Sequence, residues 1–292
     1  MATPLVSVLM TAYNREKYIA EAIESVLAST FQDFELIIVD DCSRDHTVEI
    51  VRRYTSDPRL QVHVNEKNLG DYPNRNRAAS LAKGQYLKYV DSDDYIYPRG
   101  LQIMVEMFGP FTQAAVGFCS FAQVSERPYP FQLSPREAYQ YSYFNRTHSI
   151  FSRASLSSII RRDKFEAVGG FTGKRMVGDF EMWHILAARF PVVLLPDGIV
   201  WNREHPAQEI QDFRNRPSDA FTYNRISIDY LQRPECPLLP DERKRALKMI
   251  RRGQARRILR EIAHCRGGTA RKLLAQSALK PAQIVPTAFS RV

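Results

Sequence analysis

Short apolar runs alternate with segments of helical periodicity over roughly the first 100 residues. The apolar runs are rich in β-branched residues and predict strands at 5–10, 36–39, 60–64 and 86–90. The segments between them place apolar residues on one helical face and predict helices at 18–27, 47–54 and 75–82. Elements that alternate at this spacing predict an α/β fold, with a mostly parallel, Rossmann-like sheet flanked by helices and wound with right-handed crossovers.

Polar clusters follow three of the predicted strands. They are Thr11 to Asn14, Asp40 with Asp41, and the acidic group from Asp91 to Asp94. Ligands bind parallel sheets beyond the carboxyl ends of the strands. We therefore expect these three clusters to meet in space.

The acidic group ends the segment YLKYVDSDDY, which begins at Tyr86. Its three carboxylates, Asp91, Asp93 and Asp94, repel one another and lower stability unless a cation lies among them. Mg²⁺ and Mn²⁺ prefer oxygen ligands and are often held by one or two carboxylates and a substrate phosphate. The cluster therefore predicts a divalent-metal site that binds a diphosphate, and its alternative is an acidic surface turn.

The regular pattern weakens over about 110–160, where prolines and many Tyr and Phe residues indicate irregular structure that lines a pocket. Regular elements return as a strand near 157–161, a helix at 163–168, the turn Gly169-Gly170 and a helix at 179–189. A further helix is expected after Pro240, with Asp241 at its N-terminal end.

Composition and charge indicate a globular body with a basic tail. Hydrophobic residues make up 44% of the chain and charged residues 25%. Neither a membrane-spanning stretch nor an N-terminal targeting segment is evident, and the four cysteines lack the spacing of a zinc site or a disulfide framework. We therefore expect a cytoplasmic protein.

The net charge of +9 belongs to the C-terminal region, because residues 241–272 alone hold twelve Lys or Arg against three acidic residues. Apolar residues interleave with these basic ones, as in an amphipathic helix that lies on an anionic membrane. We expect peripheral contact with the inner face of the plasma membrane through 241–272. The alternatives are a helix packed on the domain with a solvated basic face, and a nucleic-acid contact, which we do not expect.

Three segments together resemble the family 2 glycosyltransferases of GT-A fold: VSVLMTAYN, FELIIVDDCSRD and RNRAASLAKGQYLKYVDSDD. The resemblance is clear to about residue 100, returns over 157–189 and is absent from the tail. It implies a GT-A domain over 1–235, with a nucleotide-binding half at 1–100 and an acceptor half at 101–235. Residues 236–292 would form a basic helical extension.

The resemblance also implies roles for residues of the nucleotide-binding half. Thr11, Ala12, Tyr13 and Asn14 match the start of the family's nucleotide pocket, although Asn14 could instead cap a helix at Arg15. Asp41 matches the position that accepts the N3–H of uracil, although Asp40 and Asp41 could instead cap a helix near Asp45.

A cation and the acidic group complete this half. Arg75 matches an arginine near the phosphates, although a solvated helical face is the alternative. The group Asp91, Ser92, Asp93 and Asp94 corresponds to the family's DxD signature. Asp93 and Asp94 are the predicted ligands of Mn²⁺ or Mg²⁺ and contacts of the ribose, with Asp91 in support.

In the acceptor half, RMVGDFEMWHILA resembles the family's acceptor-side helix, and Asp179 matches its catalytic base. Gly178 stands where the family usually has Glu, and Glu181 is the fallback base. Trp183 and His184 are expected to pack or to line the acceptor pocket. His205, in WNREHP, is a candidate metal or diphosphate contact whose alternative is a structural histidine.

The resemblance thus implies a metal-dependent, inverting glycosyltransferase that uses a nucleotide-sugar donor, which we expect to be UDP-linked. The acceptor would be a glycan or a lipid-linked glycan in cell-surface polysaccharide synthesis. A nucleotidyltransferase would normally carry a Gly-rich loop after the first strand, and TAYNREKY contains no glycine. A non-catalytic binder of sugar nucleotides or nucleic acid is the remaining alternative.

Overall fold

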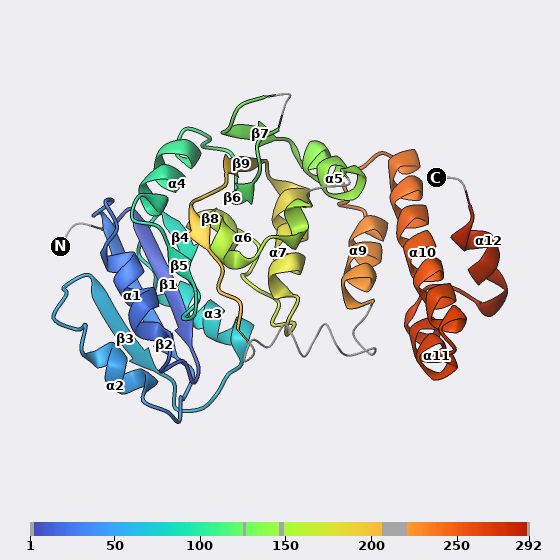
Figure 1. The fold of residues 1–292 in the computed structure, drawn as a ribbon. Helices are drawn as coiled ribbons and strands as arrows, with labels where there is room; N and C mark the ends of the chain where they lie inside the picture. Colours follow the sequence, from blue (N-terminus) through green and yellow to red (C-terminus); the bar gives the residue numbers. More distant parts are fainter. Residues whose placement is uncertain (1–2, 125–126, 146–148, 206–220, 291–292) are drawn as a thin grey trace. The chain divides into compact units, whose positions relative to one another are not determined.

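The structure is a computed structural model, and it describes residues 3–124, 127–145, 149–205 and 221–290. The chain divides into two compact units (Figure 1). The first unit comprises Met1–Ser142 and Thr147–Glu204, and the second comprises Tyr143–Arg146 and His205–Val292.

The first unit is built on an eight-stranded sheet with the strand order β3-β2-β1-β4-β8-β6-β9-β7. Strands β3, β2, β1 and β4 are parallel, β9 is parallel to β6, and β8 and β7 are antiparallel to their neighbours. The mostly parallel sheet is therefore confirmed. The bounds are β1 (Val6–Ala12), β2 (Phe34–Asp40), β3 (Leu60–Val64), β4 (Tyr86–Tyr89), β6 (Val116–Phe121), β7 (Phe131–Leu133), β8 (Ser158–Arg161) and β9 (Val192–Pro196).

Helices flank both faces of this sheet (Figure 1). One face packs against α1, α2 and α4, and its core joins Val8 and Met10 of β1 to Ile23 and Met104. On the other face Phe118 of β6 meets Trp183 of α7 with ring centroids 4.9 Å apart. The helices are α1 (Ile19–Leu27), α2 (Thr47–Arg52), α3 (Asp71–Leu81), α4 (Gly100–Phe108), α5 (Pro135–Phe144), α6 (Arg162–Ala167) and α7 (Gly178–Arg189), with 3₁₀ turns η1 (Ile150–Ser152) and η2 (Ser155–Ser157).

A second, two-stranded sheet pairs β5 (Tyr95–Ile96) with β10 (Val200–Trp201) in antiparallel fashion. Strand β5 directly follows the acidic group at Asp91–Asp94, and β10 directly precedes Asn202 and Arg203. The pairing therefore brings a segment from late in the first unit beside the acidic group.

The prediction of irregular structure over 110–160 is wrong for β6, β7 and α5. Prolines suggested breaks there, yet Pro128 and Pro130 precede β7, and Pro135 is the first residue of α5. Proline is tolerated at the first helical position because the N–H that it lacks has no partner within the helix. The aromatic residues of this region also enter the core, since Tyr139 and Phe151 are buried.

The second unit is helical, and its helices pack around a small apolar core. They are α9 (Thr222–Gln232), α10 (Pro240–Ala263), α11 (Gly267–Gln276), η4 (Pro281–Gln283) and α12 (Ile284–Ala288). Ala255 and Ile258 of α10 are buried against Leu273 and Ile284. Part of the apolar side of α10 is therefore covered by neighbouring helices. Among the described residues, no helix has both the length and the apolar character required to cross a bilayer.

Candidate functional site

The three polar clusters follow neighbouring parallel strands of the first unit. The amide of Asp41 donates to the carbonyl of Ala12 at 2.8 Å, and the amide of Val90 donates to the carbonyl of Leu9 at 3.0 Å. These bonds bring the carboxyl ends of β1, β2 and β4 to one edge of the sheet. The clusters therefore share the edge where parallel sheets bind ligands.

The acidic group forms a turn closed by a hydrogen bond of 3.0 Å from the amide of Asp94 to the carbonyl of Asp91. Each carboxylate has its own basic or amide partner. Asp91 accepts from Arg75 Nη2 at 2.6 Å, and Asp93 accepts from Arg15 Nε at 3.1 Å. Both oxygens of Asp94 accept from Asn202 Nδ2 at 2.9 Å. The turn is thus held from three sides.

Burial disfavours the ionised forms of Asp91 and Asp94. Burial, followed by the negative charge of Asp91, raises the pKa of Asp94 to about 7. Burial also raises the pKa of Asp91, against the opposing effect of Arg75. Because desolvation and like charges both disfavour ionised carboxylates, an added cation would favour their ionised form.

Arg75 lies on α3 and bridges two carboxylates, donating to Asp71 at 2.8 Å as well as to Asp91. Its guanidinium also lies near the rings of Tyr72 and Tyr89. Its Nη1 atom is buried and has no hydrogen-bond partner among the described residues. The alternative of a solvated helical face does not apply, because the side chain is only 11% exposed. An unused donor in this position suits an anionic ligand.

Asp41 is 3% exposed, and its carboxylate holds the loop that leads into α3. It accepts from the amides of Leu69 and Gly70 at 2.8 Å and from Asn65 Nδ2 at 2.7 Å. The alternative role as a cap near Asp45 is therefore wrong for Asp41. A carboxylate has about four acceptor positions, so these bonds leave capacity for one more donor. Its contact with uracil stays a prediction.

Asp40 accepts from the amide and hydroxyl of Ser43, which fixes the turn after β2. Asp45, not Asp40, accepts from the amide of Thr47 at the start of α2. The local role of Asp40 is therefore to fix this turn, and the alternative role as a helix cap is wrong for Asp40.

Thr11 and Ala12 are the last two residues of β1, and the loop that follows them contacts the loop after β2. Asn14 adopts a φ of 54° and accepts through Oδ1 from the amide of Arg44 at 2.8 Å. Helix α1 begins only at Ile19, so the alternative role of Asn14 as a cap at Arg15 is wrong. Tyr13 is 39% exposed. An exposed ring at this edge has a face available for a planar ligand.

Asp179 is the second residue of α7, and its Oδ1 atom has two donors. The hydroxyl of Tyr72 donates at 3.1 Å and the amide of Phe180 donates at 2.7 Å. Its Oδ2 atom accepts no hydrogen bond from the described residues. Burial raises the pKa of Asp179 to about 6, despite the opposing effect of the hydrogen bond from Phe180. This carboxylate is thus oriented through one oxygen and open at the other.

Gly178 precedes Asp179 and lies against the ring of Tyr72. A Cβ atom added at Gly178 would be 2.6 Å from Cδ1 and Cε1 of that ring. The departure from the family's usual Glu therefore has a steric reason: the ring that holds Asp179 occupies the space of a side chain at 178.

Glu181, the fallback base, is 1% exposed and engaged elsewhere. It accepts from the hydroxyl of Thr172 and from Lys174 Nζ at 2.5 Å. Trp183 and His184 are fully buried, and their ring nitrogens bond to the carbonyls of Arg153 and Phe180. Both therefore pack within the first unit, which was one of the two roles expected for them.

His205 belongs to the second unit and is 8% exposed. Ser92 lies inside the acidic turn and is 4% exposed. The predicted metal contact of His205 and ligand contact of Ser92 stay predictions.

Four further residues contact the site, most without a recognisable signal in the sequence: Arg15, Tyr72, Asn202 and Arg203. Arg203 donates through its amide to Asp94 and through Nε to the carbonyl of Asp93, both at 2.9 Å. Asn202 and Arg203 are about 110 positions from the acidic turn, and no local pattern indicates that distance. Helical spacing does indicate Tyr72, because it lies three positions before Arg75 on the same helical face.

The residues present fit a divalent ion that is coordinated jointly by protein carboxylates and by a substrate phosphate. Within the described part of the chain, no three His, Cys, Asp or Glu side chains are grouped to hold a metal by themselves. Mg²⁺ and Mn²⁺ are commonly bound by one or two carboxylates plus phosphate oxygens, which needs no such group. The carboxylates of Asp91 and Asp94, both with raised pKa values, and the unused donor of Arg75 suit that arrangement.

The comparisons with known proteins agree with this geometry. The sequence profile of Glycosyl transferase family 2 matches residues 7–169. A putative teichuronic acid biosynthesis glycosyltransferase, TuaG of Bacillus subtilis, is 44% identical over 92 residues, which are 31% of this chain and 36% of that protein. An uncharacterized glycosyltransferase of Methanocaldococcus jannaschii is 42% identical over 105 residues, which are 35% of this chain and 36% of that protein. The matched part spans about a third of these relatives.

Solved structures share the fold at low sequence identity. TarS 1–349 of S. aureus, in complex with UDP, gives a TM-score of 0.64 at 22% identity, covering 84% of this chain and 70% of that one. The mannosyltransferase PcManGT of Pyrobaculum calidifontis, in complex with GDP-Man and Mn²⁺, gives 0.64 at 18% identity, covering 98% of this chain and 86% of that one.

Proposed function

The chain belongs to glycosyl transferase family 2, and from that premise we propose that it moves a sugar from a nucleotide-diphosphate donor to an acceptor hydroxyl with inversion at the anomeric carbon. The observation that carries the proposal is that one helix, α3, contacts both the acidic turn and Asp179. The acidic turn at 91–94 bonds to Arg75 on α3, and Tyr72 on the same helix bonds to Asp179.

Donor binding is assigned to the acidic turn and Arg75. Asp93 and Asp94 would hold Mn²⁺ or Mg²⁺, and the ion would neutralise negative charge on the departing diphosphate. Arg75 would donate from Nη1 to a phosphate oxygen, since that atom is buried and lacks a partner among the described residues. Asp91 keeps Arg75 in place through the 2.6 Å ion pair.

Asp179 is assigned the role of general base. Inversion requires a proton acceptor on the side of the sugar opposite the leaving group. The hydroxyl of Tyr72 and the amide of Phe180 fix Oδ1, so Oδ2 would take the proton from the attacking hydroxyl. A pKa of about 6 leaves the carboxylate mostly ionised at neutral pH while keeping it more basic than an exposed aspartate.

The donor is proposed to be UDP-linked. Asp41 has acceptor capacity left for an N3–H, and the exposed ring of Tyr13 could stack on a base. TarS, a structural neighbour, is named as a complex with UDP-GlcNAc, whereas PcManGT is named as a complex with GDP-Man. Both complexes support a nucleotide sugar. A carboxylate can also accept from the N1–H of guanine, so the preference for uracil rests on the match of Asp41 to the family position that accepts the N3–H of that base.

The proposed acceptor is a glycan or a lipid-linked glycan of the cell surface. Support comes from the named roles of two relatives, teichuronic acid biosynthesis for TuaG and transfer to poly(ribitol-phosphate) for TarS. We also propose peripheral membrane contact through 241–272. In this segment Lys244 and Lys248 are exposed, and Ile262 is 50% exposed, so basic and apolar groups are both available to an anionic surface.

A panel of UDP- and GDP-sugars, each with and without Mn²⁺, tests this function. We expect one UDP-sugar to raise the melting temperature only with Mn²⁺, because a ligand that binds only the folded state stabilises it by mass action. The same donor should release UDP when acceptor glycan is added. Stabilisation without any UDP release would indicate a binder and contradict the enzymatic assignment.

A further inference from the structure

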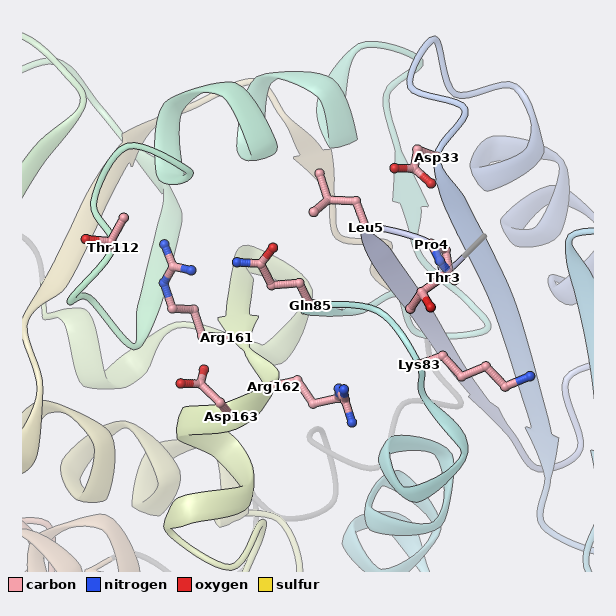
Figure 2. A pocket seen from close by; sticks show the side chains of 10 residues that line it. All are labelled: Thr3, Pro4, Leu5, Asp33, Lys83, Gln85, Thr112, Arg161, Arg162 and Asp163. Atoms are coloured by element: carbon pink, nitrogen blue, oxygen red, sulfur yellow. The ribbon is translucent and has the colours of Figure 1, made fainter. Parts of the chain in front are cut away.

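A pocket of about 450 Å³ lies at the edge of the first unit opposite the candidate site (Figure 2). Leu5, Asp33 and Gln85 line it, and each directly precedes one of the parallel strands β1, β2 and β4. The acidic turn follows the other end of β4. The pocket is therefore separate from the site assigned to catalysis.

Arg161, at the end of β8, is a wall of this pocket and is 6% exposed. Its Nη2 atom donates weakly to the carbonyls of Gly109 and Phe111, at 3.3 and 3.2 Å. Its Nε atom is buried and has no hydrogen-bond partner among the described residues. The guanidinium also lies near the rings of Tyr86 and Phe108, with centroids 5.2 and 5.3 Å away.

The charge of Arg161 has no counter-charge within the described residues, where no carboxylate lies within ion-pair distance of it. Buried charges are ordinarily paired, because removing a charge from water costs several kcal/mol when nothing compensates it. Carbonyls and aromatic faces compensate only in part. The side chain therefore has both the charge and an unused donor for an anion.

The rest of the lining adds hydrogen-bond donors, and its two cationic side chains balance its two acidic ones. Figure 2 shows the amide of Gln85 extending toward Arg161, with Thr112 on the same side and Lys83 and Arg162 on the other. Of the two acidic residues in the lining, Asp163 is paired with Lys164 at 3.2 Å. Arg162 is likewise paired with Glu166 at 3.1 Å. Among the described residues, this leaves two lining cations, Lys83 and Arg161, and one lining acid, Asp33, outside any ion pair.

We propose that this pocket binds a small molecule through an oxyanion, a phosphoryl or carboxylate group that pairs with Arg161. The planar guanidinium presents parallel donors that match either group. A volume of about 450 Å³ is in the range of small-metabolite sites, so the ligand would be a small metabolite and not a macromolecule. The ligand is distinct from the donor, since the pocket lies at the opposite edge of the sheet.

The test measures the melting temperature of the full chain with inorganic phosphate or citrate, against sodium chloride at equal ionic strength. We expect a saturable rise of a few degrees with at least one anion, because binding to the folded state stabilises it. Phosphate alone would identify a phosphoryl site, and citrate alone a carboxylate site. Equal shifts in phosphate, citrate and chloride would overturn the proposal.

Variants locate the binding. Substitution of Arg161 would mix folding and binding effects, because the side chain also holds two loop carbonyls. Thr112→Trp instead fills the pocket from an exposed position, and Lys83→Glu reverses a charge at its rim. We expect both to abolish the anion-dependent shift. Lys272→Glu, the same charge reversal on α11 of the second unit, should leave it intact. A shift that survives Thr112→Trp would place the anion elsewhere.

Discussion

The hydroxyl of Tyr72 on α3 donates a 3.1 Å hydrogen bond to Oδ1 of Asp179 on α7, across 107 positions of sequence. The same helix carries Arg75, which bonds to Asp91 of the acidic turn. One face of α3 therefore contacts both the proposed base and the proposed diphosphate site. A shift of α3 would move both together.

Asp179→Asn should abolish sugar transfer while leaving donor binding nearly unchanged. An amide cannot accept the proton, and loss of a general base lowers the rate by about 10²–10⁴-fold. Transfer is measured as UDP release with acceptor, and donor binding by titration calorimetry. Glu49→Gln removes an exposed carboxylate from α2 and serves as the control. Equal loss of binding and transfer would mean that Asp179 acts structurally.

The pH dependence of transfer should follow Asp179, whose pKa burial raises to about 6. The base must be ionised, so kcat/KM should decrease as pH falls through about 6. Stability should show the opposite sense. Because the folded-state pKa lies above the unfolded-state value, the protonated carboxyl favours folding, and this stability is lost as pH rises through about 6.

Asp179→Asn should for the same reason make the protein more stable at pH 8 than the parent. The gain should be about 1–2 kcal/mol, reduced from the full electrostatic value because the residue is partly exposed. It should disappear near pH 3.5, where the carboxyl is protonated in both states. Urea unfolding at the two pH values measures this difference. A variant less stable than the parent at pH 8 would count against a desolvated carboxylate.

Tyr72→Phe should lower kcat modestly and move the acidic limb of the pH profile upward. The hydrogen bond from Tyr72 lowers the pKa of Asp179, so its removal makes the carboxylate more basic. A purely structural role for Tyr72 would change kcat without moving the limb, so the profile separates the two. Gly178→Ala should also disturb this contact and destabilise the protein by about 1–3 kcal/mol, because the added methyl overlaps the tyrosine ring.

Asp93→Ala should abolish the Mn²⁺-dependent stabilisation by a UDP-sugar, and so should EDTA added to the parent. Arg15→Gln is the matched variant, because it removes an arginine that pairs with Asp93 but leaves the carboxylate. We expect Arg15→Gln to retain stabilisation by Mn²⁺ and donor. If Asp93→Ala were stabilised as well as the parent, the acidic turn would not be the metal site.

Replacing Lys244 and Lys248 with Glu should weaken sedimentation with anionic vesicles of phosphatidylglycerol. Each basic group near such a surface contributes about 1 kcal/mol, and reversal of its charge adds repulsion. Lys83→Glu is the matched control in the first unit, and neutral phosphatidylcholine vesicles report non-electrostatic binding. Sedimentation unaffected by the double replacement would reject the proposed membrane contact.

The sequence predicted the strands and flanking helices, because hydrophobic periodicity is a local signal. It also predicted the common edge of the polar clusters, because the carboxyl ends of parallel strands lie at one edge of their sheet. It could not predict that Asn202 binds both oxygens of Asp94, or that Tyr72 reaches Asp179, because tertiary packing brings those residues together. The region 110–160 was misinterpreted for a related reason: prolines at the borders of β7 and α5 carry the same local signal as prolines that break an element.

The ion pair between Arg15 and Asp93 has a consequence for how the protein exists without its substrates. Arginine side chains already neutralise part of the acidic turn, so the first unit can fold in the absence of a divalent ion. An ion that binds Asp93 must compete with Arg15 for this carboxylate. Chelator should therefore inhibit donor binding without unfolding the chain, in contrast to proteins whose metal is a structural requirement.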